Sequence, residues 1–162
     1  MDQLNIIQSK IIDTDELDSK LACWNFKNQK IVFTNGCFDI LHRGHIEYLA
    51  QAANSGDVLI IGLNTDHSVQ RIKGEARPVQ DQNARALVLA SLRFVDAVVF
   101  FDEDTPYELI QRVQPDILIK GSDYKAEDIV GYDIVKKKGG EIKTIDFIPG
   151  YSTTSIIEKL KK

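Results

Sequence analysis

The sequence predicts an α/β fold with an open, mostly parallel five-stranded sheet and helices on both faces. Short runs of β-branched and aliphatic residues recur along the chain, and stretches with helical spacing lie between them. The runs are continuous rather than alternating in polarity, which is typical of parallel strands that are covered on both faces. The five runs are Ile31–Thr34, Val58–Leu63, Val95–Phe101, Ile117–Lys120 and Ile142–Phe147.

Residues 1–29 are expected to form a helical extension that packs on a main domain of residues 30–162. Asp13 can cap a helix, because Glu16 stands three positions later and completes a capping box. The apolar residues that then fall near one face of this helix are Leu17, Leu21 and Trp24.

Helical patterns separate the five predicted strands. Asp81 can cap one of these helices, and Thr105-Pro106 can begin another, since proline is tolerated in the first turn. The other expected helices are His45–Ala53, a weaker one over residues 126–138, and Ser152–Leu160. Alternation of strand and helix throughout the main domain favours right-handed crossovers in one open sheet.

The composition limits the class of protein. At 162 residues and 43% hydrophobic content, the chain is long enough for one domain whose core needs no disulfide or metal. A net charge of −4 argues against a general nucleic-acid binder. Two cysteines, Cys23 and Cys37, are too few for a disulfide framework or a four-ligand zinc module. No apolar run reaches the roughly 18–20 residues of a membrane span, so we expect neither secretion nor membrane insertion.

Polar, mostly glycine-containing segments follow three of the predicted strands, at residues 35–39, 64–67 and 120–124. In open α/β sheets, ligands bind beyond the carboxyl ends of the strands, near the point where the strand order reverses. We therefore expect a functional site at this edge of the sheet. Lys120 closes an apolar strand and is expected to point into the crevice.

The segment 34–45 joins the first of these strands to its helix and contains the most candidate residues. Phosphates bind at such junctions, where backbone N–H groups meet the positive end of the helix dipole. Gly36 would let the backbone approach an anion closely. His42 and His45 are three positions apart, with Gly44 between them, so both imidazoles can project to one side and stabilise a phosphoryl group during displacement.

This junction carries a resemblance to a known family. Asn35-Gly36-Cys37-Phe38-Asp39, followed by His42-Arg43-Gly44-His45, resembles the cytidylyltransferase-like nucleotidyltransferases, which have Rossmann-like folds. The resemblance continues to about residue 160 through Arg71–Gly74, Arg77-Pro78, Arg85, Val95–Val98, Lys120–Tyr124 and Ser152–Thr154. Within the family, the chain is most similar to the branch that makes ADP-heptose. The glycerol 3-phosphate branch has an arginine-containing pattern where this chain has Ile148-Pro149-Gly150-Tyr151.

The residues and the resemblance together assign an expected role to each candidate. Catalysis is expected from His42, His45 and Lys73, and acceptor binding from Asn64, Asp66, Arg77 and Arg85. Nucleotide binding is expected from Asn35, Gly36, Cys37, Phe38, Asp39, Gly44, Lys120, Gly121, Asp123, Ser152, Thr153 and Thr154.

Simpler interpretations remain open for several of these residues. His42 and His45 could bind a structural metal together with Cys37 or Asp39, or could lie at the surface without a function. Asp39 could be only a turn residue, and Cys37 only a small buried side chain. Basic side chains such as those of Arg71, Lys73 and Arg77 are often solvated, and serines and threonines such as Ser152–Ser155 are common helix caps. The acidic run Asp102–Asp104 is interpreted as a helix start.

The expected function is transfer of AMP from ATP to a sugar 1-phosphate, heptose 1-phosphate, with release of pyrophosphate. Mg²⁺ is the expected cofactor and arrives with ATP, without a metal site built by the protein. The alternatives are a cytidylyltransferase acting on glycerol 3-phosphate or a related alcohol phosphate, and a non-catalytic nucleotide- or metal-binding domain. The two unpatterned cysteines, the net charge and the lack of a long apolar run lead us to expect a cytoplasmic protein with no nucleic-acid or membrane partner. The resemblance implies a homodimer, which could act after a separate sugar kinase.

Overall fold

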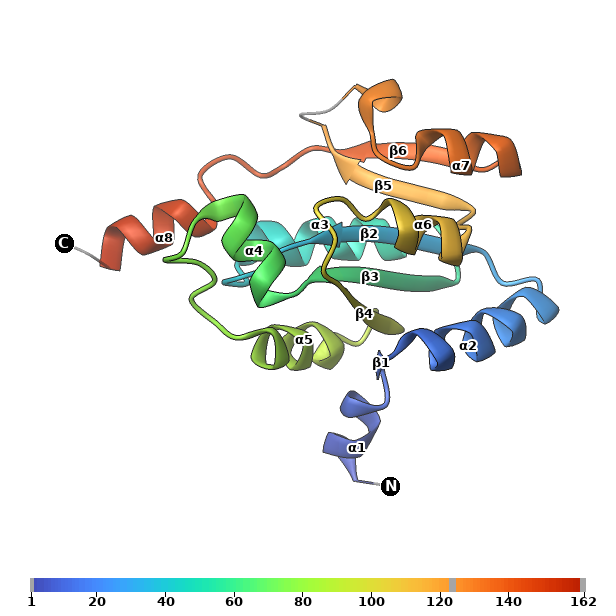
Figure 1. Ribbon diagram of the computed structural model, residues 1–162, viewed down its shortest axis with the longest axis horizontal. Coiled ribbons are helices and arrows are strands. Elements are labelled where there is room, and N and C mark those ends of the chain that lie inside the picture. The colour runs from blue at the N-terminus through green and yellow to red at the C-terminus, as the bar shows by residue number, and fades with distance from the viewer. Residues whose placement is uncertain (1, 123–124, 161–162) are drawn as a thin grey trace.

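The computed structural model describes residues 2–122 and 125–160, and it confirms an open α/β sheet with helices on both faces (Figure 1). The sheet has six strands rather than five, all parallel, in the order β1-β4-β3-β2-β5-β6. The strands are β1 (Ile11–Ile12), β2 (Ile31–Gly36), β3 (Val58–Asn64), β4 (Ala97–Phe101), β5 (Ile117–Gly121) and β6 (Glu141–Ile145). The last five correspond to the predicted runs.

Helices connect the strands, because parallel neighbours require long crossovers. They are α1 (Gln3–Gln8), α2 (Thr14–Phe26), α3 (Arg43–Ala53), α4 (Asp66–Lys73), α5 (Gln82–Ser91), α6 (Tyr107–Val113), α7 (Tyr132–Lys138) and α8 (Thr153–Leu160). The helix expected over 126–138 is divided into a 3₁₀ turn, η1 (Ala126–Asp128), and α7. Gly131, with a φ of +90°, stands at the N-cap of α7 and separates the two. No helix in the described residues is long and apolar enough to cross a membrane.

The N-terminal segment supplies the sixth strand. β1 pairs with β4 through Ile11 and Ile12, and two residues are too few to show a strand period in the sequence. The predicted capping box is present at α2: the Asp13 carboxylate accepts from the amide of Glu16, whose carboxylate accepts from the amide of Asp13. The predicted apolar face of α2 places Leu17 and Leu21 in the core.

The sheet has an apolar core on each face, because successive side chains of a strand point to opposite sides. In β2, Ile31 and Phe33 join the core beneath α2, α6 and α7, whereas Val32 joins the core beneath α3 and α5. Figure 1 shows α6 in front of the sheet and α3 behind it. Each central strand is therefore covered on both faces, which accounts for the continuous apolar runs.

The strand order creates an opening at one edge of the sheet. β2 lies between β3 and β5. The chain passes from β2 to β3 and β4 on one side, then crosses to β5 and β6 on the other side, and this reversal of strand order is the switch point of an open α/β sheet. β2 pairs with β3 along its whole length, from Ile31 to Gly36, but with β5 only at Val32 and Phe33. The carboxyl ends of β2 and β5 thus separate, and the space between them is open to side chains and ligands.

Replacing Leu17 by alanine tests whether α2 is part of the same cooperative core. Leu17 is fully buried, so Leu17→Ala should lower the free energy of unfolding by about 2–5 kcal/mol, measured by urea denaturation. Phe26→Ala on the same helix is the matched control, because Phe26 is 88% exposed and its loss should change stability by about 0.5 kcal/mol or less. Equal effects of the two substitutions would contradict this packing.

Candidate active site

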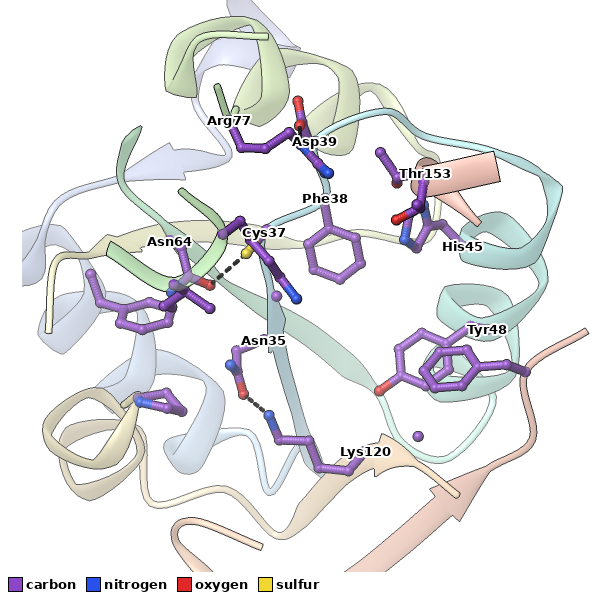
Figure 2. A pocket seen from close by; sticks show the side chains of 18 of the residues that line it. Asn35, Cys37, Phe38, Asp39, His45, Tyr48, Asn64, Arg77, Lys120 and Thr153 are labelled. Carbon is purple, nitrogen blue, oxygen red and sulfur yellow. Dashed lines mark hydrogen bonds and ion pairs between the residues drawn. The ribbon is translucent and has the colours of Figure 1, made fainter. Parts of the chain in front are cut away.

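A cavity of about 440 Å³ lies at the separated ends of β2 and β5 (Figure 2). Figure 2 shows Lys120 with Asn35 at one side, Arg77 with Asp39 at the opposite side, and His45 and Thr153 between them on the side of α3. The residues that line it are Asn35, Gly36, Cys37, Phe38, Asp39, His45, Tyr48, Asn64, Ile72, Lys73, Arg77, Phe101, Asp104, Pro106, Lys120, Gly121, Phe147, Thr153 and Thr154.

The loop after β2 forms one wall of the cavity. Phe38 adopts a φ of +43°, an uncommon conformation for a residue with a side chain, and its ring is nearly buried. A Cβ at Gly36 would lie 3.0 Å from that ring, so glycine permits the close turn. The Phe38 ring meets the His45 ring edge-on, with 5.3 Å between their centroids. The loop therefore holds His45 against an apolar surface.

His42 and His45 stack on each other instead of converging on one point. His42 is the N-cap of α3, and the two rings lie 3.8 Å apart with an interplanar angle of 20°. A Cβ at Gly44 would lie 3.1 Å from the His42 ring, so a side chain there would disturb the stack. Of the pair, His45 lines the cavity, and His42 stacks on it without being part of the lining.

Both imidazoles are held in their neutral form at neutral pH. Burial lowers the pKa of His45 to about 4, and the neighbouring His42 ring contributes to the shift. Burial also lowers the pKa of His42. A neutral imidazole offers one N–H donor and one acceptor nitrogen. A bound anion close to His45 would favour its charged form, so this side chain can respond to negative charge in the cavity.

Among the described residues, three cationic side chains line the cavity, each from a different element: Lys73 from α4, Arg77 from the segment before α5, and Lys120 from β5. Lys120 donates to the Asn35 carboxamide and so connects the ends of β5 and β2 across the opening. Arg77 donates from Nε to Asp39 over 2.6 Å. The separation of these cations suits a ligand with several phosphate groups.

Asp39 is a buried carboxylate that orders this wall. Its Oδ1 accepts from the amides of Val79 and Gln80 at 2.8 and 3.0 Å, and its Oδ2 accepts from Arg77. Burial acts to raise the pKa of Asp39, but these donors bind the charged form more strongly and lower the pKa. Its carboxylate thus belongs to the framework of the cavity.

Cys37 and Asn64 meet at the side of the cavity nearest β3. The Cys37 thiol lies 3.9 Å from the Asn64 carboxamide oxygen, and the Asn64 amide donates to Ser68 at 2.9 Å. Burial raises the pKa of the Cys37 thiol, although nearby cations oppose the shift. The thiol is therefore protonated at neutral pH, which is unfavourable for a nucleophile.

The C-terminal segment closes the remaining side. Thr153 and Thr154, at the start of α8, line the cavity, and the Thr153 hydroxyl donates to the Ile40 carbonyl at 3.3 Å. Ser152 is the cap: its hydroxyl accepts from the amide of Ser155 at 3.1 Å. A hydroxyl cap and cavity-lining threonines thus occur together in this segment.

The structure does not bring every predicted site residue to the cavity. Asp66 and Arg85 form an ion pair of 2.7 Å behind the loop after β2, and the Arg85 side chain has no exposed surface with which to contact an acceptor. His42, Gly44 and Ser152 also lie outside the lining. Asp123 falls outside the described residues.

Several lining residues were not singled out in the sequence. Tyr48 stands one helical turn after His45, packs its ring against Phe147 at 5.6 Å, and shares a hydrogen bond of 2.8 Å with Thr34. Helical spacing from His45 could have identified Tyr48. Phe101 is the last residue of β4, and Asp104 follows that strand in the acidic run 102–104, which the sequence pattern indicated as a helix start. The others are Ile72, Pro106 and Phe147.

A smaller cavity of about 170 Å³ adjoins the first and shares Asp104, Pro106 and Lys120 with it. The rest of its lining is Thr105, Asp128, Ile129 and Val130. Carboxylates and a hydroxyl thus stand beside apolar surface. Within residues 2–122 and 125–160, no three His, Cys, Asp or Glu side chains form a group that could hold a metal ion.

The open parallel sheet, with its polar cavity at the switch point, defines a Rossmann-like α/β domain. The chain belongs to the Cytidylyltransferase-like family, which it matches over residues 33–159. It is 53% identical over 156 residues to the bifunctional protein HldE of Rhodopseudomonas palustris (strain HaA2), and 54% identical over 154 residues to HldE of Campylobacter concisus. These matches cover 96% and 95% of this chain. They cover 32% and 31% of the relatives, so the chain spans about a third of their length.

Two solved structures are also similar. The lipopolysaccharide core biosynthesis protein of Thermoplasma volcanium GSS1 has 29% sequence identity and a TM-score of 0.59, over 74% of this chain and 97% of that one. The pantoate-beta-alanine ligase of Francisella tularensis has a TM-score of 0.63 and 20% identity, over 93% of this chain and 76% of that one. The second likeness concerns the fold alone.

The pKa of His45 can be measured by following its ring protons in NMR spectra from pH 3 to 8. We expect a midpoint near pH 4, and a higher midpoint in His42→Asn, because the neighbouring ring no longer disfavours the charge. The pKa of His45 is lower in the folded protein than in the unfolded chain, so the unfolded chain binds the proton more readily between these two values. The free energy of unfolding should therefore be unaffected by His45 above about pH 6.5 and should decrease as the pH falls toward 4. A midpoint near 6.5 in the native protein would contradict the buried stack.

Proposed function

We propose that this protein is an adenylyltransferase that transfers AMP from ATP to heptose 1-phosphate, forming ADP-heptose and pyrophosphate. The observation that carries the proposal is one cavity at the switch point that is lined by Lys73, Arg77 and Lys120 together with His45. The sugar is supported by the 51–54% identity to HldE proteins and by the likeness to a lipopolysaccharide core biosynthesis protein.

The reaction needs no covalent enzyme intermediate. A phosphate oxygen of the sugar phosphate attacks the α-phosphorus of ATP, a new P–O bond forms, and the bond to the β-phosphate oxygen breaks. The electron pair leaves with pyrophosphate. Because the nucleophile is already an anion, positioning and charge stabilisation account for most of the catalysis.

Each cavity cation would bind phosphate oxygens, and His45 would donate a hydrogen bond where negative charge develops. Because the pKa of His45 is lowered, its ring stays neutral in the unliganded cavity and adds no positive charge to those of the cationic side chains. Mg²⁺ would enter bound to the triphosphate, where it neutralises phosphate charge. The first turn of α3 adds the positive end of a helix dipole beside this site.

The test is pyrophosphate release by the purified protein with Mg²⁺, pairing ATP or CTP with heptose 1-phosphate or glycerol 3-phosphate. We expect turnover with ATP and heptose 1-phosphate. His45→Ala should lower kcat by about 10²–10³-fold, the usual cost of removing one preorganised donor. His67→Ala is the matched control, since His67 is exposed and lies outside the cavity lining, and it should leave kcat unchanged.

Turnover only with CTP and glycerol 3-phosphate would identify the other branch of the family. Absence of turnover in all four pairings, with ATP still bound, would favour a non-catalytic nucleotide-binding domain. Unchanged turnover in His45→Ala would overturn the role of that histidine.

We further propose that the acceptor sugar occupies the smaller cavity. Sugars are recognised by hydrogen-bonding side chains around an apolar surface, and Asp128 and Thr105 stand there beside Ile129 and Val130. Lys120, which lines both cavities, would bind the phosphate at their junction. This position also agrees with the burial of Arg85, which leaves that side chain unable to reach an acceptor.

Asp128→Asn should raise the KM for heptose 1-phosphate by about tenfold and leave the KM for ATP within twofold, because one charged hydrogen-bond acceptor for the sugar is lost. Glu127→Gln provides the control: this neighbouring carboxylate is exposed and does not line the cavity. Steady-state kinetics with each substrate varied in turn would measure both constants. An equal rise in the two KM values would contradict a sugar-specific role.

A further inference from the structure

Arg85 is the largest fully buried side chain of the protein's described residues, and it lies behind the cavity instead of in it. Its guanidinium donates in three directions: to the Cys37 carbonyl at 2.6 Å, the Gln80 carbonyl at 3.1 Å and the Asp66 carboxylate at 2.7 Å. A buried charge is costly unless it is paired and hydrogen-bonded. Each acceptor belongs to a different segment, so this one side chain joins all three.

The segments that Arg85 joins are the ones that carry the cavity wall. Cys37 belongs to the loop after β2, and Gln80 to the segment between Arg77 and α5. Asp66 is the first residue of α4, the helix that ends with Lys73. Two main-chain carbonyls and one helix start are thus fixed relative to one another by a planar group with a fixed donor geometry.

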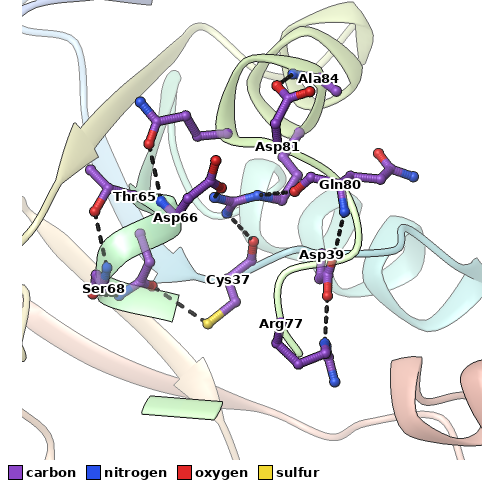
Figure 3. A network of polar contacts seen from close by, with 12 residues as sticks. Cys37, Asp39, Thr65, Asp66, Ser68, Arg77, Gln80, Asp81 and Ala84 are labelled. Carbon is purple, nitrogen blue, oxygen red and sulfur yellow. Dashed lines mark hydrogen bonds and ion pairs between the residues drawn. The ribbon is translucent and has the colours of Figure 1, made fainter. Parts of the chain in front are cut away.

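Asp39 completes the network from the opposite side. The Gln80 amide donates to Asp39, and the Gln80 carbonyl accepts from Arg85. Both main-chain polar groups of Gln80 are therefore hydrogen-bonded to buried side chains. Figure 3 shows Asp39 between Gln80 and Arg77. A path of hydrogen bonds therefore runs from Arg85 through Gln80 and Asp39 to Arg77.

This path of hydrogen bonds fixes the orientation of the Arg77 guanidinium toward the cavity. Asp39 accepts from Nε of Arg77, the nitrogen nearest the stem of the side chain. Within the described residues, the terminal nitrogens of Arg77 make no hydrogen bond, and the side chain lines the cavity. Held at one edge, the guanidinium can offer its other N–H groups to a phosphate in a single orientation.

We propose that Arg85 is a positioning residue for the phosphate-binding wall: it never touches substrate, but sets the loop at Cys37 and, through Gln80 and Asp39, the orientation of Arg77. The inference rests on the proposed function for its kinetic consequence. The structural part of the inference is that Arg85 keeps residues 77–80 in one conformation, and this part does not depend on which substrates the protein uses.

The test compares Arg85→Lys with Arg85→Met. Lysine keeps the positive charge but has a single ammonium group in place of the planar, forked guanidinium. If Arg85 only balanced the charge of Asp66, lysine would retain activity and methionine would not. For a positioning role, both variants should lose at least tenfold in kcat/KM, and both should show faster amide hydrogen exchange at Val79 and Gln80. Far-UV circular dichroism would verify that each variant is folded.

Arg112→Lys is the matched control, because Arg112 forms an ion pair with Asp18 over 2.7 Å and does not line the cavity. It should change neither kinetics nor exchange at residues 79 and 80. Native kinetics and native exchange in Arg85→Lys would overturn the proposal. If the native protein itself shows no turnover, the proposed function fails, and the inference is then decided by exchange together with ATP affinity from calorimetry, which both Arg85 variants should weaken at least tenfold.

Discussion

The separation of β2 from β5 beyond Phe33 is the constraint on which the site depends. Where two parallel strands diverge, their main-chain groups lose their partners and side chains must fill or bridge the opening. Lys120 and Asn35 do so from opposite strands. Because β3 stays paired with β2 to Gly36, the opening has one rigid wall, and the loop that leaves β2 enters it from a fixed direction.

The stacked histidines follow from the same geometry. The loop after β2 must turn back toward α3, and its Phe38 ring shields His45 from water. A shielded imidazole loses hydration in its charged form, and a second imidazole 3.8 Å away disfavours the charge further. The lysine and arginine side chains that line the cavity are therefore not repelled by a charged His45 ring. An arriving anion meets donors that are already oriented.

Local patterns in the sequence indicated much of this arrangement, whereas contacts between distant segments were not accessible from it. Glycines and polar residues directly after apolar runs predicted which edge of the sheet holds the site, because the end of a strand can be recognised from neighbouring residues in the sequence. Arg85 illustrates what the sequence could not predict. Its position beside Ala86 and Leu89 on α5 indicates that it is buried. Its hydrogen-bond partners, however, come from the loop after β2 and from α4, which are distant in the sequence. β1 and α4 were missed because two residues carry no period, and α4 has few apolar residues.

An acidic chain can hold a polyanionic ligand because the relevant charges act at short range. At physiological ionic strength, exposed charges farther apart than about 8 Å are largely screened, so the net charge of −4 has little influence inside the cavity. Asp39 is the acidic side chain buried in its wall, and that carboxylate is neutralised by Arg77 and two amides. Lys73 and Lys120 line the same cavity, where their positive charges can act on a bound phosphate at short range. The buried ion pairs thus separate two tasks: Asp39 and Arg85 stabilise the wall, and the cations that line the cavity act on the ligand.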